Sequence, residues 1–119
     1  MRAVVAVLAI VAASAAWASQ PATNSRTKAS PVSAGKQVYD KWCAACHASG
    51  PRHPGTASLA VKYGKDLPAP LEQRADLTPE LVAYFVRHGV SVMPPFRKTE
   101  ITDAELASLG AYLSRPPRK

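Results

Sequence analysis

Cysteine is scarce in this chain of 119 residues, which has only Cys43 and Cys46. Two cysteines allow at most one disulfide, and it would close a loop too small to add much stability. A fold held together by a disulfide framework is therefore excluded. Strand signals are also missing, because no segment alternates apolar and polar residues and no turn pair indicates a hairpin. Together with the lack of an internal repeat, these absences predict an all-α protein of one small domain.

Acidic residues are few, with 8 Asp and Glu against 15 Lys and Arg, so the formal net charge is +7. The basic residues are scattered and do not form the dense stripe, interleaved with aromatics, that is typical of nucleic-acid binding. We therefore do not expect nucleic acid as a partner. The positive balance has two open interpretations, which are solubility and electrostatic steering towards an acidic partner.

The chain lacks an apolar run long enough to span a bilayer comfortably, which takes about 20 residues. Its longest run, residues 3–13, follows a short basic start and precedes an A-x-A-type cleavage site that ends at Ala18. Residues 1–18 therefore predict a cleaved secretory signal, with export to the periplasm and no membrane segment in the mature form. The polar residues 19–33 include two prolines and predict a flexible leader.

Both cysteines belong to one C-x-x-C-H pentapeptide at residues 43–47. This pattern attaches a c-type haem, because two thiols form thioethers to the porphyrin vinyl groups and the adjacent histidine ligates the iron. Cys43 and Cys46 are the predicted attachment residues, and His47 is the predicted axial ligand. A chain this short builds a thin core, which a covalently held prosthetic group would reinforce. The sequence therefore predicts one covalent haem c.

Met93 is the predicted second axial ligand. Apart from Met1 it is the only methionine, and it lies in a proline-rich loop, where a rigid backbone would hold a weakly binding sulfur in place. His53 follows His47 too closely to reach the opposite face of a haem. His88 lies near a helix C-terminus, where the helix dipole explains its presence. Ligation by histidine and methionine closes both axial positions, which suits electron transfer better than oxygen chemistry.

Three main helices and one or two short ones are predicted from apolar stripes at helical spacing and from capping residues. The first expected helix begins at Gly35, is capped by Ser33 and runs straight into the C-x-x-C-H motif. A short helix over 56–63 and an irregular connection over 66–76 with one turn should follow. The last two expected helices are one between Thr78 and Gly89 and one that opens with a capping box at Thr102–Glu105 and stops at Pro116.

With these residues located, the sequence resembles the class I cytochromes c over residues 34–114, which leaves 115–119 as a C-terminal tail. The matching features, in chain order, are Gly35 and Tyr39 before Cys43, Pro54 after the motif, Met93 followed by Pro94, and Leu109 followed by Tyr112 in the last helix. The resemblance implies the class I cytochrome c fold and an electron-transfer protein without catalytic residues. Pro54 is also expected to present its carbonyl to the ring N–H of His47, since ligating histidines usually donate this hydrogen bond.

A narrower resemblance is to the cytochrome subunit of p-cresol methylhydroxylase, a flavocytochrome. It is carried by residues 54–56, 59, 62–63, 77–81, 85–87, 89–94 and 96–101. The resemblance implies a flavoprotein dehydrogenase partner that oxidises a 4-alkylphenol, from whose flavin this chain would accept single electrons and pass them to a downstream acceptor. A free-standing electron carrier stays open as the alternative.

The loop around Met93 is expected to lie beside the exposed haem edge, where a partner would dock. Val92, Pro95 and Phe96 are candidates for an apolar contact, and Arg87, Arg97 and Lys98 are candidates for steering charges on its rim. For any single one of these charges, solvated surface is the simpler interpretation.

Two other classes of protein stay open. C-x-x-C is also the motif of thiol–disulfide oxidoreductases, although these need a βαβ pattern around the cysteines. A haem protein with an open iron, which would bind carbon monoxide when reduced, is the second class, and Met93 argues against it.

Overall fold

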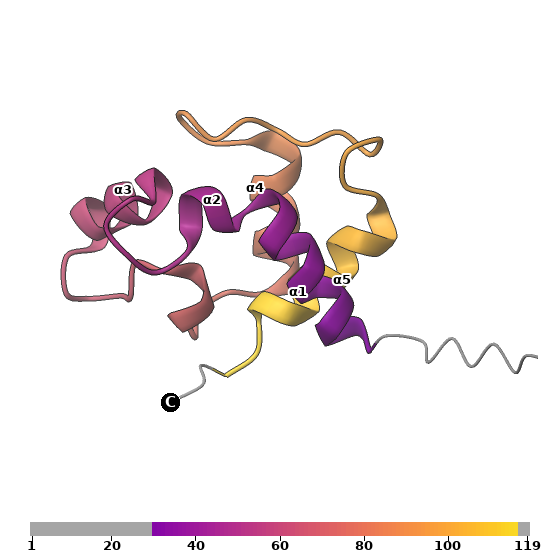
Figure 1. Ribbon diagram of the computed structural model, residues 1–119, viewed down its shortest axis with the longest axis horizontal. Coiled ribbons are helices and arrows are strands. Elements are labelled where there is room, and N and C mark those ends of the chain that lie inside the picture. Colours follow the sequence, from indigo (N-terminus) through magenta and orange to yellow (C-terminus); the bar gives the residue numbers. More distant parts are fainter. Residues whose placement is uncertain (1–29, 117–119) are drawn as a thin grey trace, which may run out of the picture.

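The computed structural model describes residues 30–116, and in this range it is all-helical (Figure 1). The elements are α1 (Pro31–Trp42), α2 (Ala44–His47), α3 (Pro54–Tyr63), the 3₁₀ turn η1 (Leu71–Gln73), α4 (Pro79–His88) and α5 (Asp103–Leu113). The all-α prediction is confirmed. No helix between residues 30 and 116 is long and apolar enough to cross a membrane. The predicted signal at 1–18, and the leader as far as residue 29, lie outside the described residues.

Helix α1 begins earlier than the sequence predicted. Its N-cap is Ser30, whose Oγ accepts a hydrogen bond from the Ser33 amide at 3.2 Å, and Pro31 occupies the first turn. The prediction of Ser33 as the cap is wrong, because a proline at the first helical position favours a start three residues earlier. Residues 31–33, the end of the predicted leader, are therefore helical.

A break at Cys43 separates α1 from α2, so the first helix does not run uninterrupted through the motif as predicted. The Cys43 carbonyl accepts hydrogen bonds from the amides of Cys46 (3.0 Å) and His47 (2.9 Å). These bonds begin a separate helical turn that carries the end of the motif.

The starts of α4 and α5 agree with the predicted capping signals. Thr78 Oγ1 accepts a hydrogen bond from the Leu81 amide at 3.2 Å, and Thr102 and Glu105 form a reciprocal capping box. Helix α4 ends at Gly89, as predicted. Helix α5 ends at Leu113, before the proline that was expected to stop it, because the chain already leaves helical geometry at Ser114.

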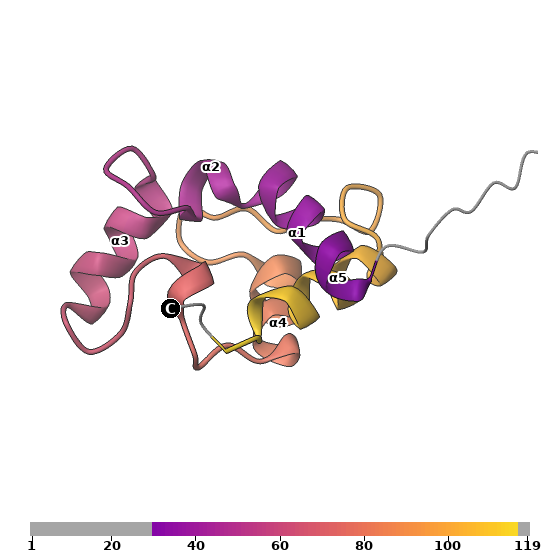
Figure 2. The ribbon, with the colours of Figure 1, turned by 60° about the horizontal axis from the view of Figure 1, so that its bottom comes forward.

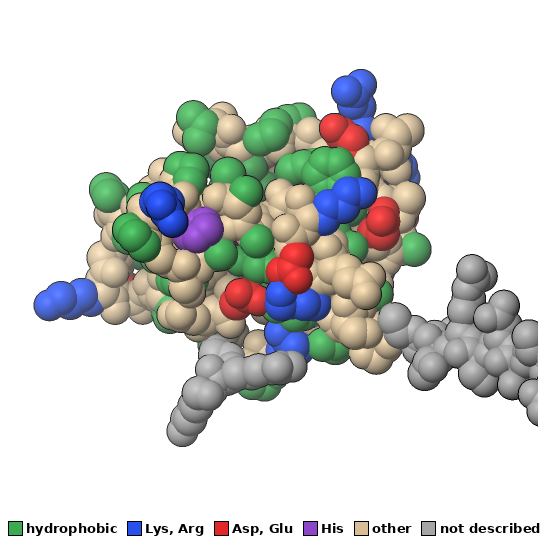
Figure 3. Space-filling model, viewed as in Figure 1, with side chains coloured by type: hydrophobic (Ala, Val, Ile, Leu, Met, Phe, Trp, Pro, Cys, Tyr) green, Lys and Arg blue, Asp and Glu red, His purple; other side chains and the backbone are tan. Residues whose placement is uncertain are grey.

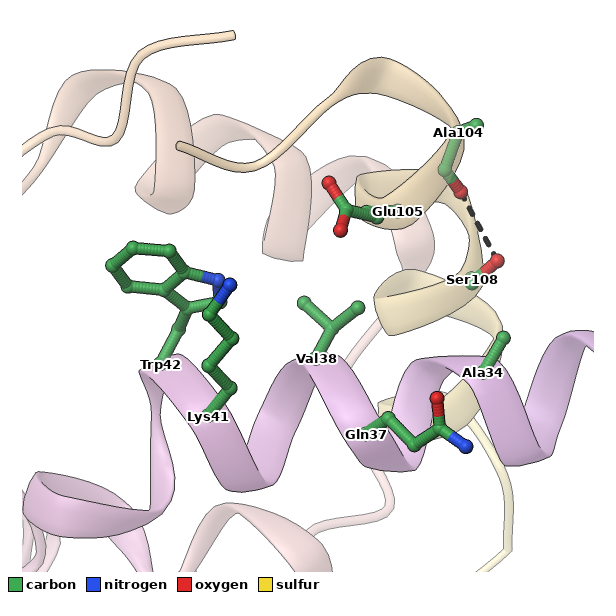
Figure 4. Close-up of a pocket in the computed structure, with 8 residues that line it drawn as sticks. All are labelled: Ala34, Gln37, Val38, Lys41, Trp42, Ala104, Glu105 and Ser108. Carbon is green, nitrogen blue, oxygen red and sulfur yellow. Dashed lines mark hydrogen bonds between the residues drawn. The ribbon is translucent and has the colours of Figure 1, made fainter. Parts of the chain in front are cut away.

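Helices α1 and α5 cross in close contact at Gly35. A Cβ at this position would overlap the Ser108 carbonyl oxygen and lie 2.6 Å from the Tyr112 Cβ. Beside this crossing the two helices form a shallow groove, with Trp42 and Val38 on one side and Glu105 and Ser108 on the other (Figure 4). Only glycine lets the two backbones approach this closely.

The buried apolar core lies at the α1–α5 end of the molecule, while α3 lies at the opposite end (Figures 1 and 2). Its members are Val38, Tyr39, Val82, Val86, Ile101, Leu106, Leu109, Tyr112 and Leu113. Between residues 44 and 77 the fully buried polar or charged residues are Thr56 and Arg74, and no large apolar side chain in that stretch is fully buried. Several apolar residues of this half, among them Leu59, Leu71 and Leu77, instead face a cleft.

Candidate functional site

A mainly apolar cleft separates the motif, α3 and the connection to α4 from the packed core. Its walls are formed by Cys43 and His47 from the motif; Leu59, Lys62 and Tyr63 from α3; Leu71, Arg74 and Leu77 from the connection; Leu81, Val82, Phe85 and Val86 from α4; Val90 and Met93 from the following loop; and Leu109 and Leu113 from α5. The fold thus brings Met93 to the same cleft as Cys43 and His47, although it lies far from both in the sequence.

The backbone at the start of α3 packs against the His47 ring. A Cβ on Gly55 would lie 2.6 Å from the His47 Cε1 atom, so the backbone of the first turn of α3 lies directly against the imidazole. Burial lowers the pKa of His47. The ring is therefore held in the neutral form, which is the form that binds a metal.

The predicted hydrogen bond between His47 and the Pro54 carbonyl does not form. The Nδ1 atom of His47 is buried and has no hydrogen-bond partner. Pro54 is the first residue of α3, and its carbonyl accepts a hydrogen bond from Ser58 Oγ at 2.9 Å. The backbone of Gly55, which follows Pro54, is what contacts the ring.

The two cysteines are free and occupy different environments. Cys43 is partly buried in the cleft wall, whereas Cys46 is exposed and does not line the cleft. Burial, with a smaller contribution from Cys46, raises the pKa of the Cys43 thiol to about 11. A thiol–disulfide oxidoreductase needs the opposite shift, a lowered thiol pKa. The described residues also contain no βαβ unit, so this class of protein is not supported.

Met93 lies in a tight turn that folds back on the end of α4. The amides and carbonyls of Val90 and Met93 pair with each other at 3.0 and 2.9 Å. Gly89 has a φ of 68°, and a Cβ there would collide with the Met93 carbonyl. The glycine at the end of α4 therefore both terminates the helix and makes room for the methionine loop.

The other two histidines are engaged elsewhere. His53 Nδ1 lies 3.0 Å from the Ala45 carbonyl oxygen, and His88 Nδ1 lies 2.8 Å from that of Tyr84. The His88 ring also stacks on the Tyr84 ring, with 4.4 Å between centroids. Neither histidine lines the cleft, which leaves Met93 as the candidate opposite His47.

The predicted partner contacts divide into two groups. Val92 is 91 % exposed, Pro95 is exposed, and the Arg97 side chain is 84 % exposed. Phe96, in contrast, packs edge-to-face with Trp42, with ring centroids 5.7 Å apart. Hydrophobic side chains are visible along the edge of the molecule that the α4–α5 connection forms (Figure 3). The exposed part of the predicted docking surface is therefore Val92, Pro95 and Arg97.

The candidate steering charges also differ from one another. The Arg87 side chain is only 19 % exposed and forms an ion pair with Asp103 at 2.9 Å. Its charge is therefore compensated within the molecule. Lys98 pairs with the same carboxylate at 2.8 Å but remains largely exposed. The charges of Arg97 and Lys98 are exposed and could attract a partner, whereas the Arg87 side chain is mostly buried.

Arg74 is a cleft residue that the sequence did not reveal. It is 5 % exposed, its Nε donates to Asp76 Oδ1 at 2.9 Å, and its guanidinium lies 4.6 Å from the centre of the Tyr63 ring. An arginine two residues before an aspartate is too common a pattern to indicate burial. Only the fold shows that this charge lies in the cleft wall.

The helical fold and a cleft with a C-x-x-C-H histidine on one wall and a methionine on another define a c-type cytochrome of class I. Residues 30–113 match the family model described as cytochrome C oxidase, cbb3-type, subunit III. The chain is also 34 % identical over 87 residues to cytochrome c6 of Picosynechococcus sp. (strain ATCC 27264 / PCC 7002 / PR-6), a match that covers 72 % of this chain and 74 % of that protein. The chain belongs to the cytochrome c family. It is a monohaem electron-transfer protein with covalently bound haem c, and it is not a catalytic enzyme.

The residues of the cleft fit a haem. Its walls are mostly leucine, valine and phenylalanine, which suit a flat apolar ring. The imidazole and thioether offered by His47 and Met93 are known axial ligands of haem iron. The buried Nδ1 of His47 has no partner, so the hydrogen bond that usually orients a ligating histidine is absent and the ring is held by its packing against Gly55.

Proposed function

We propose that Cys43 and Cys46 form the thioether bonds to the haem and that His47 and Met93 are its axial ligands. The observation that supports this proposal is the shared cleft, whose walls include Cys43, His47 and Met93. When bound, the haem supplies an iron centre that gains and loses a single electron. The chain supplies neutral imidazole on one wall, a thioether held by a tight turn on another, and apolar surfaces that exclude water.

The assignment of Met93 is tested by the substitution Met93→Ala. Removing the thioether should abolish the sulfur-to-iron charge-transfer band of the oxidised protein, because the other sulfur in the cleft wall, that of Cys43, is already used in the proposed bond to the haem. The reduced variant should bind carbon monoxide readily, since one axial position is then open. Absorption spectra of the oxidised protein and of the reduced protein under carbon monoxide measure both effects.

Val92→Ala is the matched control, because Val92 precedes the proposed ligand and its side chain is almost fully exposed. This variant should keep the band and should resist carbon monoxide at neutral pH. If the band persists in Met93→Ala, the ligand assignment is wrong. If the unaltered reduced protein already binds carbon monoxide, the protein has an open iron.

We further propose that residues 1–18 direct export to the periplasm and that the mature protein accepts single electrons from a flavoprotein dehydrogenase that oxidises a 4-alkylphenol. The proposal rests on the resemblance to flavocytochrome subunits around α4 and the Met93 loop. Exposed Val92 and Pro95 offer an apolar contact there, with the Arg97 charge beside them. The alternative is a free-standing carrier, which is favoured by a similarity that extends over 74 % of cytochrome c6.

Purification from the native host distinguishes these two functions. A tagged copy of the full chain should co-purify with a flavin-containing subunit if it belongs to a flavocytochrome. A Val92→Asp variant should lose that subunit while keeping its haem spectrum, because a charge would be buried at the contact. A tagged protein that emerges without any flavoprotein would support the free-standing carrier.

A further inference from the structure

The connection from α4 to α5, residues 89–102, has little regular structure of its own. Apart from the Val90–Met93 pair, its contacts with the helices include the hydrogen bond from the Phe96 amide to the Val86 carbonyl (2.7 Å), the Phe96 ring against Trp42, the Lys98–Asp103 pair and the buried side chain of Ile101. A loop that presents a weakly binding thioether must be held by contacts outside itself.

Arg87 makes several such contacts from the last turn of α4. Its Nη1 donates to the Phe96 carbonyl at 3.0 Å, and its Nη2 donates to the Ile101 carbonyl at 2.9 Å. Nη2 also donates to Asp103 Oδ1, in the first turn of α5, at 2.9 Å. One guanidinium therefore joins α4, two points of the connection and the start of α5.

The geometry requires an arginine. The planar guanidinium places several N–H donors at fixed angles, whereas a lysine ammonium is a compact charge that cannot span the same two carbonyls. Hydrogen bonds from a charged group are stronger than neutral ones, and an unpaired buried carbonyl is costly. Loss of Arg87 therefore removes one hydrogen bond at Phe96 and one at Ile101 together.

We propose that Arg87 is a positioning residue that fixes the Met93 loop and so determines how firmly the thioether stays on the iron. This inference rests on the proposed ligation by Met93. Arg87 itself does not line the cleft. Its action is through the backbone of residues 96–101, which limits how far the loop can open.

The test compares Arg87→Gln with Arg97→Gln in the haem-containing protein. Both variants lose one positive charge close to Met93, but the Arg97 side chain is mostly exposed and makes only a 3.8 Å ion pair with Glu100. Free imidazole binds the oxidised iron only after the methionine leaves, so its apparent affinity reports the fraction of open loop. We expect imidazole to bind Arg87→Gln about tenfold or more tightly than the unaltered protein, and Arg97→Gln to stay within about twofold.

Two further variants separate the carbonyl contacts from the ion pair. Arg87→Lys keeps the charge and should still show tighter imidazole binding, whereas Asp103→Asn keeps both carbonyl contacts and should remain near the unaltered protein. Arg87→Lys also serves as the test if Arg87→Gln fails to fold. Unchanged imidazole affinity in Arg87→Lys and Arg87→Gln would overturn the inference, as would an equal rise in Arg97→Gln.

Amide hydrogen exchange at Phe96 provides a readout that does not depend on the axial ligand. The Phe96 amide hydrogen, which is bonded to the Val86 carbonyl, should exchange with solvent faster in Arg87→Gln than in the unaltered protein. The amides of α5 should keep their protection. If the unaltered protein lacks the sulfur-to-iron band, the ligand proposal fails by itself. If the band is present but Phe96 exchange is unchanged in the variant, the role of Arg87 fails by itself.

Discussion

At the scale of single residues, the buried charge of Arg74 places an ion pair at the wall of the cleft. Its side chain is nearly inaccessible, while its partner Asp76 is partly exposed. The hydrogen bond from Arg74 is the main cause that lowers the pKa of Asp76. Because breaking a buried pair leaves an uncompensated charge, loss of the carboxylate should cost more than loss of a surface ion pair.

The Arg74–Asp76 pair predicts a pH-dependent stability. A carboxyl group whose pKa is lowered by folding stabilises the fold above its unfolded value of about 3.9, and this stabilisation is lost as the pH falls through the lowered folded value. Asp76→Asn should therefore destabilise the protein at about pH 7, and its cost should shrink towards about pH 2. Urea unfolding at several pH values measures the difference.

Asp40→Asn is the control for this measurement, because Asp40 pairs with Lys36 on the exposed face of α1. Exposed ion pairs contribute roughly 0–1 kcal/mol, so this variant should change little at any pH. A cost of Asp76→Asn that is the same at neutral and acid pH would show that the carboxylate charge does not stabilise the fold.

At the scale of elements, the contact of α1 with α5 brings the N- and C-terminal helices together and supports the motif. Gly35→Ala should destabilise the protein by about 1–3 kcal/mol, since the added methyl group overlaps the backbone of α5. Helix propensity alone would favour alanine by about 1 kcal/mol. A net loss of stability would therefore demonstrate the steric contact. Denaturant unfolding of the haem-containing protein measures it.

The control for Gly35→Ala is Gln37→Ala, at an exposed position of the same helix. It should shift the free energy of unfolding by no more than about 0.5 kcal/mol. If Gly35→Ala had the same free energy of unfolding as this control, α1 and α5 would have to move apart without loss of stability. The close crossing would then be unimportant for stability.

At the scale of the whole molecule, the buried core is unequally distributed. It is built by α1, α4, α5 and Ile101, while α3 contributes only Thr56 to the fully buried residues. Leu59, Leu71 and Leu77 of the α3 half line the cleft instead. This half of the protein therefore depends on the haem to bury its apolar surface.

The unequal core predicts how the protein responds to loss of the haem. In a Cys43→Ala, Cys46→Ala double variant made without haem, amides of α1, α4 and α5 should keep measurable protection, while those of α3 exchange as in an unfolded segment. Hydrogen exchange of the variant and of the haem-containing protein measures this. Equal protection of α3 and α5 in the variant would show that α3 folds without the haem.

Much of the fold could be predicted from the sequence because its signals are local. The caps at Thr78 and Thr102 and the stop at Gly89 each involve residues within one helical turn. The start of α1 was misplaced because Ser30 and Ser33 both offer a capping hydroxyl and Pro31 decides between them. The break at Cys43 has no local sequence signal that distinguishes it from a continuing helix.

The candidate ligands were likewise evident from local patterns, since C-x-x-C-H is a single pentapeptide and Met93 is a lone methionine between helices. The roles of Phe96, Arg74 and Arg87 were not, because each depends on partners brought together only by folding. Phe96 lies against Trp42, and Arg87 reaches from α4 to α5. Motif chemistry and helix caps can thus be read from neighbouring residues, whereas burial, the pairing of charges and the supports of the Met93 loop are set by tertiary packing.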